Sequence, residues 1–174
     1  MAAIRRRVKI STGDRVDALI EDWRRERPEL DANAMGVVGR ILRLGKVLEA
    51  RANAVLTDTG LNYTDLDVLA TLRRSGAPYR LTPTALRGSV LITSGAMTAC
   101  LDRLAEKSLV LRATHGSDRR SVAVELTKTG RTLIDHAIVL RFDEATNALS
   151  GLAPSDQERL ASLLRELTLM LDIQ

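Results

Sequence analysis

Aromatic residues are scarce in this chain of 174 residues, which contains one Trp, two Tyr and one Phe. Because β-sheets are rich in aromatic and β-branched residues, this scarcity argues against a β-sandwich. Hydrophobic residues make up 45% of the chain and charged residues 28%, which are ordinary fractions for a globular protein. The composition therefore excludes a disordered tail protein, a collagen-like repeat and a disulfide scaffold. Its abundant Leu, Ala and Arg favour a helical fold.

Cysteine and long apolar segments are also nearly absent. The single cysteine, Cys100, excludes an internal disulfide and favours a reducing compartment. No apolar run approaches the ~18 residues that a membrane-spanning helix needs. The basic residues near the N-terminus are not followed by the apolar segment of a secretory signal. We therefore expect a cytoplasmic protein without a membrane partner.

Enzyme motifs are missing as well. The sequence contains no P-loop, no G-x-G-x-x-G after a predicted strand and no H-E-x-x-H. Its two histidines, His115 and His136, are far apart and have no cysteine or carboxylate at metal-ligand spacing. We therefore expect no enzymatic activity, no cofactor and no metal. The net charge of +4 is a modest indication of an acidic partner.

Apolar periodicity predicts two helices in the N-terminal part. The first covers residues 14–27 and ends before Pro28, because the residue before proline avoids the helical conformation. The second covers residues 33–57 and carries a narrow, nearly coiled-coil seam. That seam fits either a partner helix or the core of the chain itself, and periodicity alone does not separate the two.

The middle of the chain predicts a helix-turn-helix followed by a hairpin. Asn62, with Asp65 three residues on, caps a predicted helix to residue 75, and Thr82 caps a second one over residues 83–89. A short turn joins the second helix to a third over residues 93–107, whose inward face carries Met97, Leu101, Leu104 and Ala105. Alternating apolar residues then predict two strands, near residues 109–111 and 122–126, with a polar loop over residues 114–120 between them. A hairpin directly after such a helix pair is the winged helix-turn-helix arrangement.

Two more helices close the chain. Thr127 caps a helix to about Leu149, and a capping box of Ser155 and Glu158 predicts the start of the last helix. The last helix is apolar almost to the chain end, so we expect it to be covered by dimerisation. The predicted fold is mainly α with a small β-hairpin wing. It is one integrated domain whose parts are listed by residue: an N-terminal extension with the first dimerisation helix (1–60), a winged DNA-binding region (61–127) and C-terminal dimerisation helices (128–174).

Two segments are candidates for binding DNA. The helix over residues 93–107 begins with small and hydroxyl-bearing residues that suit phosphate and base-edge contacts. The hairpin tip carries guanidinium groups that can enter a minor groove. Taken alone, that tip is more simply a solvated turn, but the helix-turn-helix before it favours DNA. The candidate residues are Thr93, Ser94, Gly95 and Thr98 on the helix, and Asp118, Arg119 and Arg120 on the tip.

The segment from Leu81 to Gly130 resembles the DNA-binding core of the MarR family of bacterial transcription regulators. The resemblance implies an α-rich winged-helix homodimer on a pseudo-palindromic operator, with Asp118 and Arg120 matching the wing's Asp-x-Arg signature. In one departure, Ala99 and Cys100 stand where members often carry an Asn-Arg pair. Thr84, Arg87 and Arg103 are the candidates to compensate. The resemblance is carried by Thr93-Ser94-Gly95-Ala96-Met97-Thr98, Leu101-Asp102-Arg103-Leu104, Leu109-Val110, Asp118-Arg119-Arg120, Leu126-Thr127 and Gly130.

The added N-terminal helix is similar to that of the urate-responsive branch of the family (the HucR and PecS type). This resemblance implies that Trp23, Asp67 and Arg74 bind a small anionic or aromatic ligand. A further arginine of that branch matches either Arg103 or Arg112. The simpler interpretation is a surface ion pair, which would contribute at most ~1 kcal/mol, together with a tryptophan that only packs.

Cys100 is a second candidate sensor, because a thiol on the reading helix could be oxidised and block DNA binding. Such a thiol must be accessible and have a low pKa, whereas cysteine is more often a small buried hydrophobe. The sequence thus predicts a DNA-binding transcription regulator, a repressor released by a small ligand. The alternatives are a protein that coats DNA without sequence preference and an interaction module that has lost DNA reading.

Overall fold

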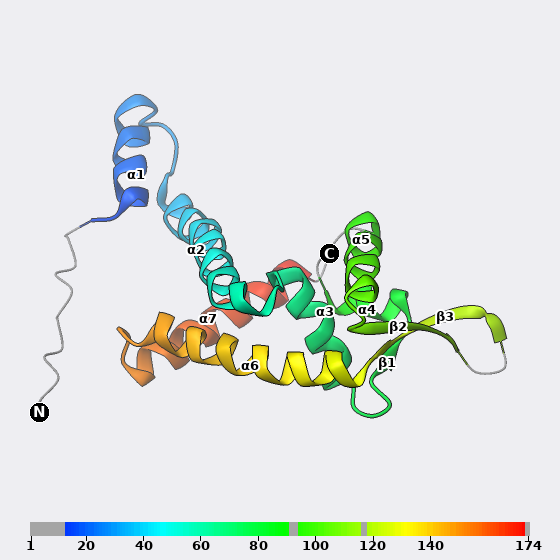
Figure 1. The fold of residues 1–174 in the computed structure, drawn as a ribbon. Coiled ribbons are helices and arrows are strands. Elements are labelled where there is room, and N and C mark those ends of the chain that lie inside the picture. The colour runs from blue at the N-terminus through cyan, green and yellow to red at the C-terminus, as the bar shows by residue number, and fades with distance from the viewer. Residues whose placement is uncertain (1–12, 91–93, 116–117, 173–174) are drawn as a thin grey trace, which may run out of the picture. The chain divides into compact units, whose positions relative to one another are not determined.

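The structure is a computed structural model that describes residues 13–90, 94–115 and 118–172 (Figure 1). For residues 94, 113–115, 118–122 and 172 it describes the backbone alone. The chain forms two compact units, Met1–Glu49 and Ala50–Gln174, whose boundary lies within one long helix. The expected division at residues 60 and 127 stays a prediction.

The first unit contains α1 (Arg15–Glu26) and most of α2 (Asn33–Leu56). Asp14 caps α1 in a capping box with Asp17, as negative groups near a helix N-terminus do. Arg40 of α2 donates hydrogen bonds to both carboxylates, at 3.0 Å from Asp14 and 2.6 Å from Asp17. Val16 and Ile20 are buried on the inner face of α1. Both predicted N-terminal helices are confirmed.

The second unit contains the remaining elements. The caps predicted at Asn62, Thr82 and Thr127 are present, and each side chain accepts a hydrogen bond from a backbone N–H of the first turn. The elements are the 3-10 turn η1 (Thr57–Thr59), α3 (Tyr63–Arg74), β1 (Arg80–Leu81), α4 (Pro83–Ser89), α5 (Ser94–Glu106), β2 (Val110–His115), β3 (Asp118–Leu126), α6 (Lys128–Leu149) and α7 (Pro154–Asp172).

The strands form an antiparallel sheet in the order β1-β3-β2. In β2 and β3, Val110 pairs with Leu126 and Thr114 with Val122, so the ladder extends into the loop expected over residues 114–120. Polar side chains do not prevent antiparallel pairing, and the expectation of a long loop is wrong. The strand β1 was not predicted, because two residues are too few to show an alternating pattern. It pairs Arg80 with Glu125.

The core of the second unit lies around α3, which packs against α4, α5, β3 and α6. Met97, Leu101 and Leu104 of α5 are buried as expected, and Ala105 is half-buried. The largest fully buried apolar side chains are Leu56, Leu69, Leu72, Leu86, Met97, Leu104 and Ile134. A continuous core of this kind fixes how α4, α5 and the sheet are presented to a ligand.

The last helix begins two residues earlier than expected, because a cap at Ser155 predicts Asp156 as the first helical residue. α7 starts at Pro154, where proline fits the first helical position because its missing N–H has no intrahelical partner. Ser155 therefore lies inside the first turn, and the capping box predicted for Ser155 and Glu158 is wrong. The apolar stripe of this helix is largely exposed in the single chain. Among the helices that the structure describes, none is long and apolar enough to cross a membrane.

Candidate nucleic-acid interface

The helices α4 and α5 form a helix-turn-helix whose first helix is held by its cap and its buried face. Thr82 Oγ1 accepts a hydrogen bond from the Ala85 N–H at 3.1 Å, and Pro83 occupies the first helical position. Leu86 of this helix is buried, and so is Val90 at its C-cap. The side chains of Thr84 and Arg87, which the sequence predicts to contact DNA, are exposed on α4.

The second helix, α5, has one buried and one exposed face. Met97, Cys100, Leu101 and Leu104 are buried against the core. Among its described side chains, the exposed residues are Gly95, Ala96, Thr98, Ala99, Asp102 and Glu106. The spacing of Gly95, Thr98, Ala99 and Asp102 at i, i+3, i+4 and i+7 places them along one side of the helix. This side is the surface that α5 offers to a partner.

Arg103 does not belong to that exposed side. Its Nε donates a hydrogen bond to the Asp65 carboxylate at 3.1 Å, and a second guanidinium nitrogen bonds to the same oxygen. Asp65 is 1% exposed and also accepts from its own cap, the backbone N–H of Asn62, at 3.2 Å. The sequence indicated Asp65 as a capping residue but gave no signal for its bond to a residue 38 positions away. Arg103, expected to compensate on DNA, instead ties α5 to α3.

Cys100 lies in the same cluster. Its side chain is buried, and its Sγ lies 3.4 Å from Asp65 Oδ1. Burial, together with the charge of the nearby Asp65 carboxylate, raises the pKa of the Cys100 thiol to about 12. A redox sensor needs an accessible thiolate, so this environment argues against the redox hypothesis.

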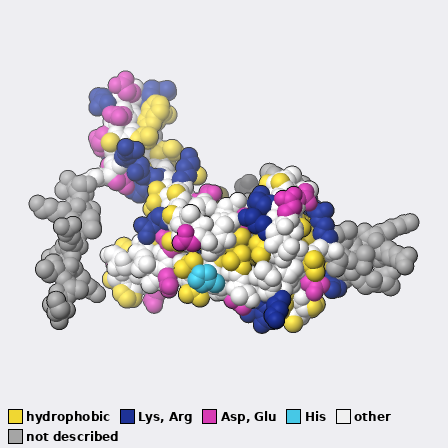
Figure 2. All heavy atoms as spheres, viewed as in Figure 1, with side chains coloured by type: hydrophobic (Ala, Val, Ile, Leu, Met, Phe, Trp, Pro, Cys, Tyr) yellow, Lys and Arg dark blue, Asp and Glu magenta, His cyan; other side chains and the backbone are white. Residues whose placement is uncertain are grey.

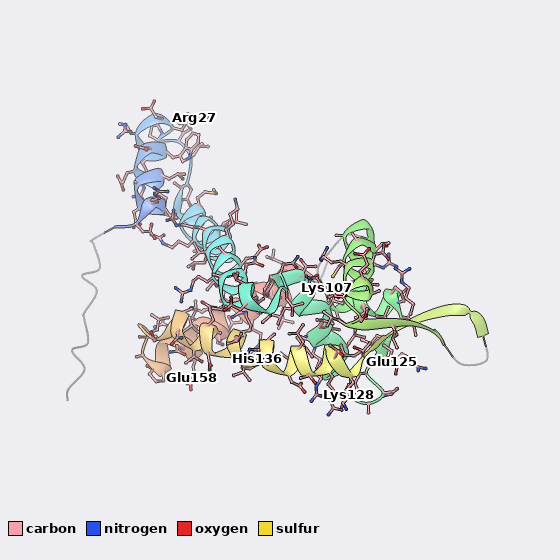
Figure 3. All side chains as sticks on the ribbon, viewed as in Figure 1. Arg27, Lys107, Glu125, Lys128, His136 and Glu158 are labelled. Carbon is pink, nitrogen blue, oxygen red and sulfur yellow. The ribbon has the colours of Figure 1, made fainter. Side chains whose placement is uncertain are left out.

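The wing consists of β2 and β3, and its tip carries the remaining predicted DNA contacts. The backbone of Asp118, Arg119 and Arg120 begins β3, and their side chains lie outside the described residues. Thr93 and the side chain of Ser94 lie outside them too. Several Lys and Arg side chains are visible on the described part of this unit in Figure 2, and Lys107 and Lys128 are labelled in Figure 3.

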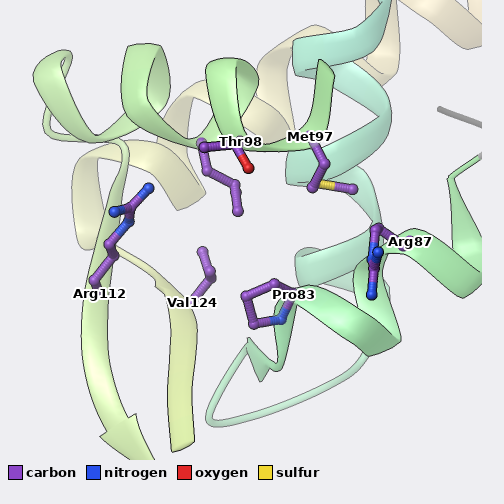
Figure 4. Close-up of a pocket in the computed structure, with 7 residues that line it drawn as sticks. Pro83, Arg87, Met97, Thr98, Arg112 and Val124 are labelled. Carbon is purple, nitrogen blue, oxygen red and sulfur yellow. The ribbon is translucent and has the colours of Figure 1, made fainter. Parts of the chain in front are cut away.

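A pocket of about 310 Å³ lies between α4, α5 and the wing (Figure 4). Arg87 of α4 and Arg112 of β2 stand on opposite sides of it in this view, with Thr98 of α5 above. Arg112 is paired with Asp102 of α5. The pocket thus combines two guanidinium groups with an apolar lining that includes Met97 and Val124.

The residues predicted to bind a small ligand lie in both units. Trp23 is on α1 of the first unit and is 47% exposed. Asp67 and Arg74 are both on α3 of the second unit, where Thr71 Oγ1 accepts from Arg74 at 2.8 Å. Partial burial raises the pKa of Asp67, and the positive charge of Arg74 opposes that shift. The structure therefore brings Asp67 and Arg74 to one helix as predicted from their spacing.

The described residues offer little to a metal. They contain no group of three or more His, Cys, Asp or Glu side chains that could hold a metal ion. His136 is exposed on α6 (Figure 3). The exposed side of α5 instead carries small side chains, and the arginines Arg87 and Arg112 lie on either side of the pocket beside it.

Comparison with known proteins agrees with this geometry. Residues 61–122 match the family described as the MarR family. The HTH-type transcriptional regulator PecS of Dickeya dadantii (strain 3937) is 32% identical over 149 residues, which are 86% of this chain and 90% of PecS. A mutant MarR from E. coli in complex with operator DNA has a TM-score of 0.69 and 25% identity, over 78% of this chain and 96% of that chain.

A third similar protein is one whose DNA binding is regulated by a small molecule. BpsR of Bordetella bronchiseptica, whose DNA binding is regulated by 6-hydroxynicotinic acid, has a TM-score of 0.67 and 24% identity, over 75% of this chain and 92% of BpsR. At this identity the likeness concerns the fold. PecS is named as a transcriptional regulator rather than as an enzyme. The sequence identity to PecS over most of both chains identifies the family: this chain belongs to the MarR family.

Proposed function

We propose that this protein is a dimeric, sequence-specific DNA-binding transcription regulator of the cytoplasm, a repressor released by a small ligand. The observation that carries the proposal is the exposed face of α5, presented by a helix-turn-helix and followed by a β-wing in a member of the MarR family. An α-helix fits the major groove of B-DNA, and a wing reaches the adjacent minor groove. PecS is named as a regulator, and the mutant MarR was solved with operator DNA.

Dimerisation is supported by apolar side chains on the last two helices. Phe142 of α6 is 70% exposed, and Val139, Leu163, Met170 and Leu171 are more than half exposed. Exposed apolar surface of this extent marks an interaction site. A second copy of the chain is the partner that we propose. Two copies of α5 then enter successive major grooves about one helical turn apart, on a pseudo-palindrome.

The proposed DNA contacts divide by role. Thr84 and Arg87 of α4 contact phosphates, and Gly95 and Thr98 of α5 lie against the bases. We propose two further sets of DNA contacts. One is made at the start of α5 by Thr93 and Ser94, and the other at the wing tip by Asp118, Arg119 and Arg120.

The wing contribution is tested by Arg120→Ala. Loss of one guanidinium that neutralises backbone charge should weaken binding to every duplex and lower the slope of log affinity against log salt by about 1. Fluorescence anisotropy at two salt concentrations measures both, using the duplex upstream of the protein's own gene and a scrambled duplex. The matched control is Arg159→Ala, an exposed arginine of α7, which should leave affinity unchanged.

Other results would contradict the proposal in different ways. Unchanged affinity for Arg120→Ala removes the wing from the mechanism. Equal binding of the wild-type protein to both duplexes supports a coating protein, and no binding to either supports an interaction module.

For the ligand, we propose a small aromatic anion held by Asp67 and Arg74 of α3, whereas the contact that the resemblance implies for Trp23 stays a prediction. Support comes from the partly buried carboxyl and the arginine on one helix of the second unit, and from BpsR, which is regulated by an aromatic acid. A ligand acts only if it binds one conformation of the protein more tightly than the other.

Release from DNA tests this ligand proposal. With urate, 6-hydroxynicotinate and related aromatic acids as probes, at least one should displace the labelled duplex. Arg74→Ala should raise the half-maximal concentration about tenfold or more, because one charge-assisted hydrogen bond is lost. Arg112→Ala is the matched comparison, since it removes a cation of the pocket in Figure 4 instead. A loss of release that follows Arg112 and not Arg74 would move the ligand site to that pocket.

A further inference from the structure

The exposed side of α5 lacks the side chains that usually identify purines. Arginine or lysine reads guanine, and asparagine or glutamine reads adenine, each through a pair of hydrogen bonds in the major groove. Between Ser94 and Glu106 the sequence has no lysine, asparagine or glutamine, and its one arginine is Arg103. The structure binds Arg103 to Asp65 on the other side of the helix. Lys107, just beyond α5, donates to the Gly60 carbonyl at 2.6 Å.

One acidic residue on this side, Asp102, is already paired. A carboxylate can accept a hydrogen bond from the amino group of cytosine. Asp102, however, is paired with Arg112 of the wing strand β2. Apart from the hydroxyl groups of Ser94 and Thr98 and the carboxylate of Glu106 in its last turn, α5 therefore offers few polar side chains for direct reading of base pairs.

Methyl groups are what α5 does present. Ala96 and Ala99 each expose a Cβ, and Thr98 carries a γ-methyl group on an exposed side chain. At Gly95, a Cβ would have no neighbour within 4 Å, so the space beside this residue is open. Among the bases, thymine alone carries a methyl group in the major groove, and Ala and Thr are residues that contact it.

We infer that α5 recognises its half-site chiefly by packing Ala96, Thr98 and Ala99 against thymine methyl groups. This inference rests on the proposed function and specifies which bases α5 reads. Burial of one methyl-sized group corresponds to about a fourfold change in affinity. The wild-type protein should therefore prefer half-sites with thymines at the positions that face α5.

The test removes only the methyl groups. The full-length protein first selects its preferred duplex from a randomised pool. Thymines of the half-site are then replaced one at a time by deoxyuridine, and affinity is measured by anisotropy competition. At least one replacement should weaken binding about fourfold. Replacing half-site guanines by 7-deazaguanine, which lacks the N7 acceptor, should change affinity less than twofold.

A protein variant assigns the contact to α5. In Ala99→Gly, the deoxyuridine that faces residue 99 should bind as well as thymine, because the protein methyl is gone. Ala54→Gly, the same change at an exposed position of α2, should keep the fourfold discrimination and controls for the poor helix propensity of glycine. Circular dichroism verifies that both variants are folded.

The outcomes separate this inference from the proposed function. A selected consensus that is insensitive to deoxyuridine, or sensitive to 7-deazaguanine instead, overturns methyl reading while the regulator stands. Discrimination that persists in Ala99→Gly removes Ala99 from it. A pool that yields no preferred sequence overturns the proposed function, and this inference with it.

Discussion

Replacing Gly130 by Ala is expected to destabilise the protein by about 3 kcal/mol or more, because overpacking against a fixed backbone lies at the upper end of such effects. A Cβ on Gly130 would lie 2.0 Å from the Leu109 carbonyl oxygen and 2.9 Å from its carbon. That oxygen also accepts from the Thr127 N–H at 3.1 Å, so it cannot withdraw without losing a hydrogen bond. The helix must move away from the sheet.

The sign of this effect is informative because helix propensity predicts the opposite. In an exposed helix, changing Gly to Ala stabilises by up to about 1 kcal/mol. Gly88 of α4 has no atom within 4 Å of an added Cβ, so Gly88→Ala is the matched control and should be neutral or slightly stabilising. Urea denaturation followed by circular dichroism measures both variants. Equal stability of Gly130→Ala and the wild type would mean that α6 and β2 do not approach as closely as described.

The second large effect is expected for Asp65→Ala, at about 2 to 3 kcal/mol of lost stability. Breaking a buried ion pair costs about 3 to 5 kcal/mol when the remaining charge stays buried. Here the remaining side chain, Arg103, is 38% exposed and can be hydrated, which lowers the cost. The substitution also removes the acceptor of the Asn62 N–H and leaves Cys100 without its carboxylate partner.

Asp102→Ala is the control for Asp65→Ala. Asp102 also pairs with an arginine, Arg112, but both side chains are about half exposed, and such pairs contribute at most about 1 kcal/mol. The two variants thus compare the loss of an Asp–Arg ion pair at a buried carboxylate with the same loss at an exposed one. A loss for Asp65→Ala no larger than that for Asp102→Ala would show that burial of the carboxylate does not matter here. Because Asp65 orients α5, its variant should also weaken DNA binding at temperatures where it is folded.

Most of the fold follows from local patterns that the sequence makes visible. Caps such as Asn62, Thr82 and Thr127 mark helix starts by a bond within three residues, so their positions are predictable. The short strand β1 is not, because Arg80 and Leu81 become a strand only through pairing with β3, more than 40 positions later. The start of α7 differs by two residues, because Pro154 suits the first helical position better than Ser155 suits the cap.

Less of the binding surface than of the fold is predictable from the sequence, because several of its residues depend on partners that are distant in the chain. The exposed position of Thr98 and Ala99 follows from helical spacing. The role of Arg103 does not, because its partner Asp65 is distant in sequence and only the packing of α3 against α5 brings them together. The same packing buries Cys100 and raises its pKa. Interactions that depend on tertiary contacts are absent from local sequence patterns.

The contact between Leu109, Thr127 and Gly130 has a mechanical consequence. Since Thr127, the N-cap of α6, donates its N–H to the carbonyl of Leu109, the residue that precedes β2, we expect a tilt of α6 to carry the wing with it. The 22 residues of α6 span about 33 Å at ~1.5 Å per residue. A tilt of about 5° at the far end of α6 would displace the wing by about 3 Å, close to the ~3.4 Å between successive base pairs. A small rearrangement at the far end of α6 would therefore shift the wing by about one base step along the operator.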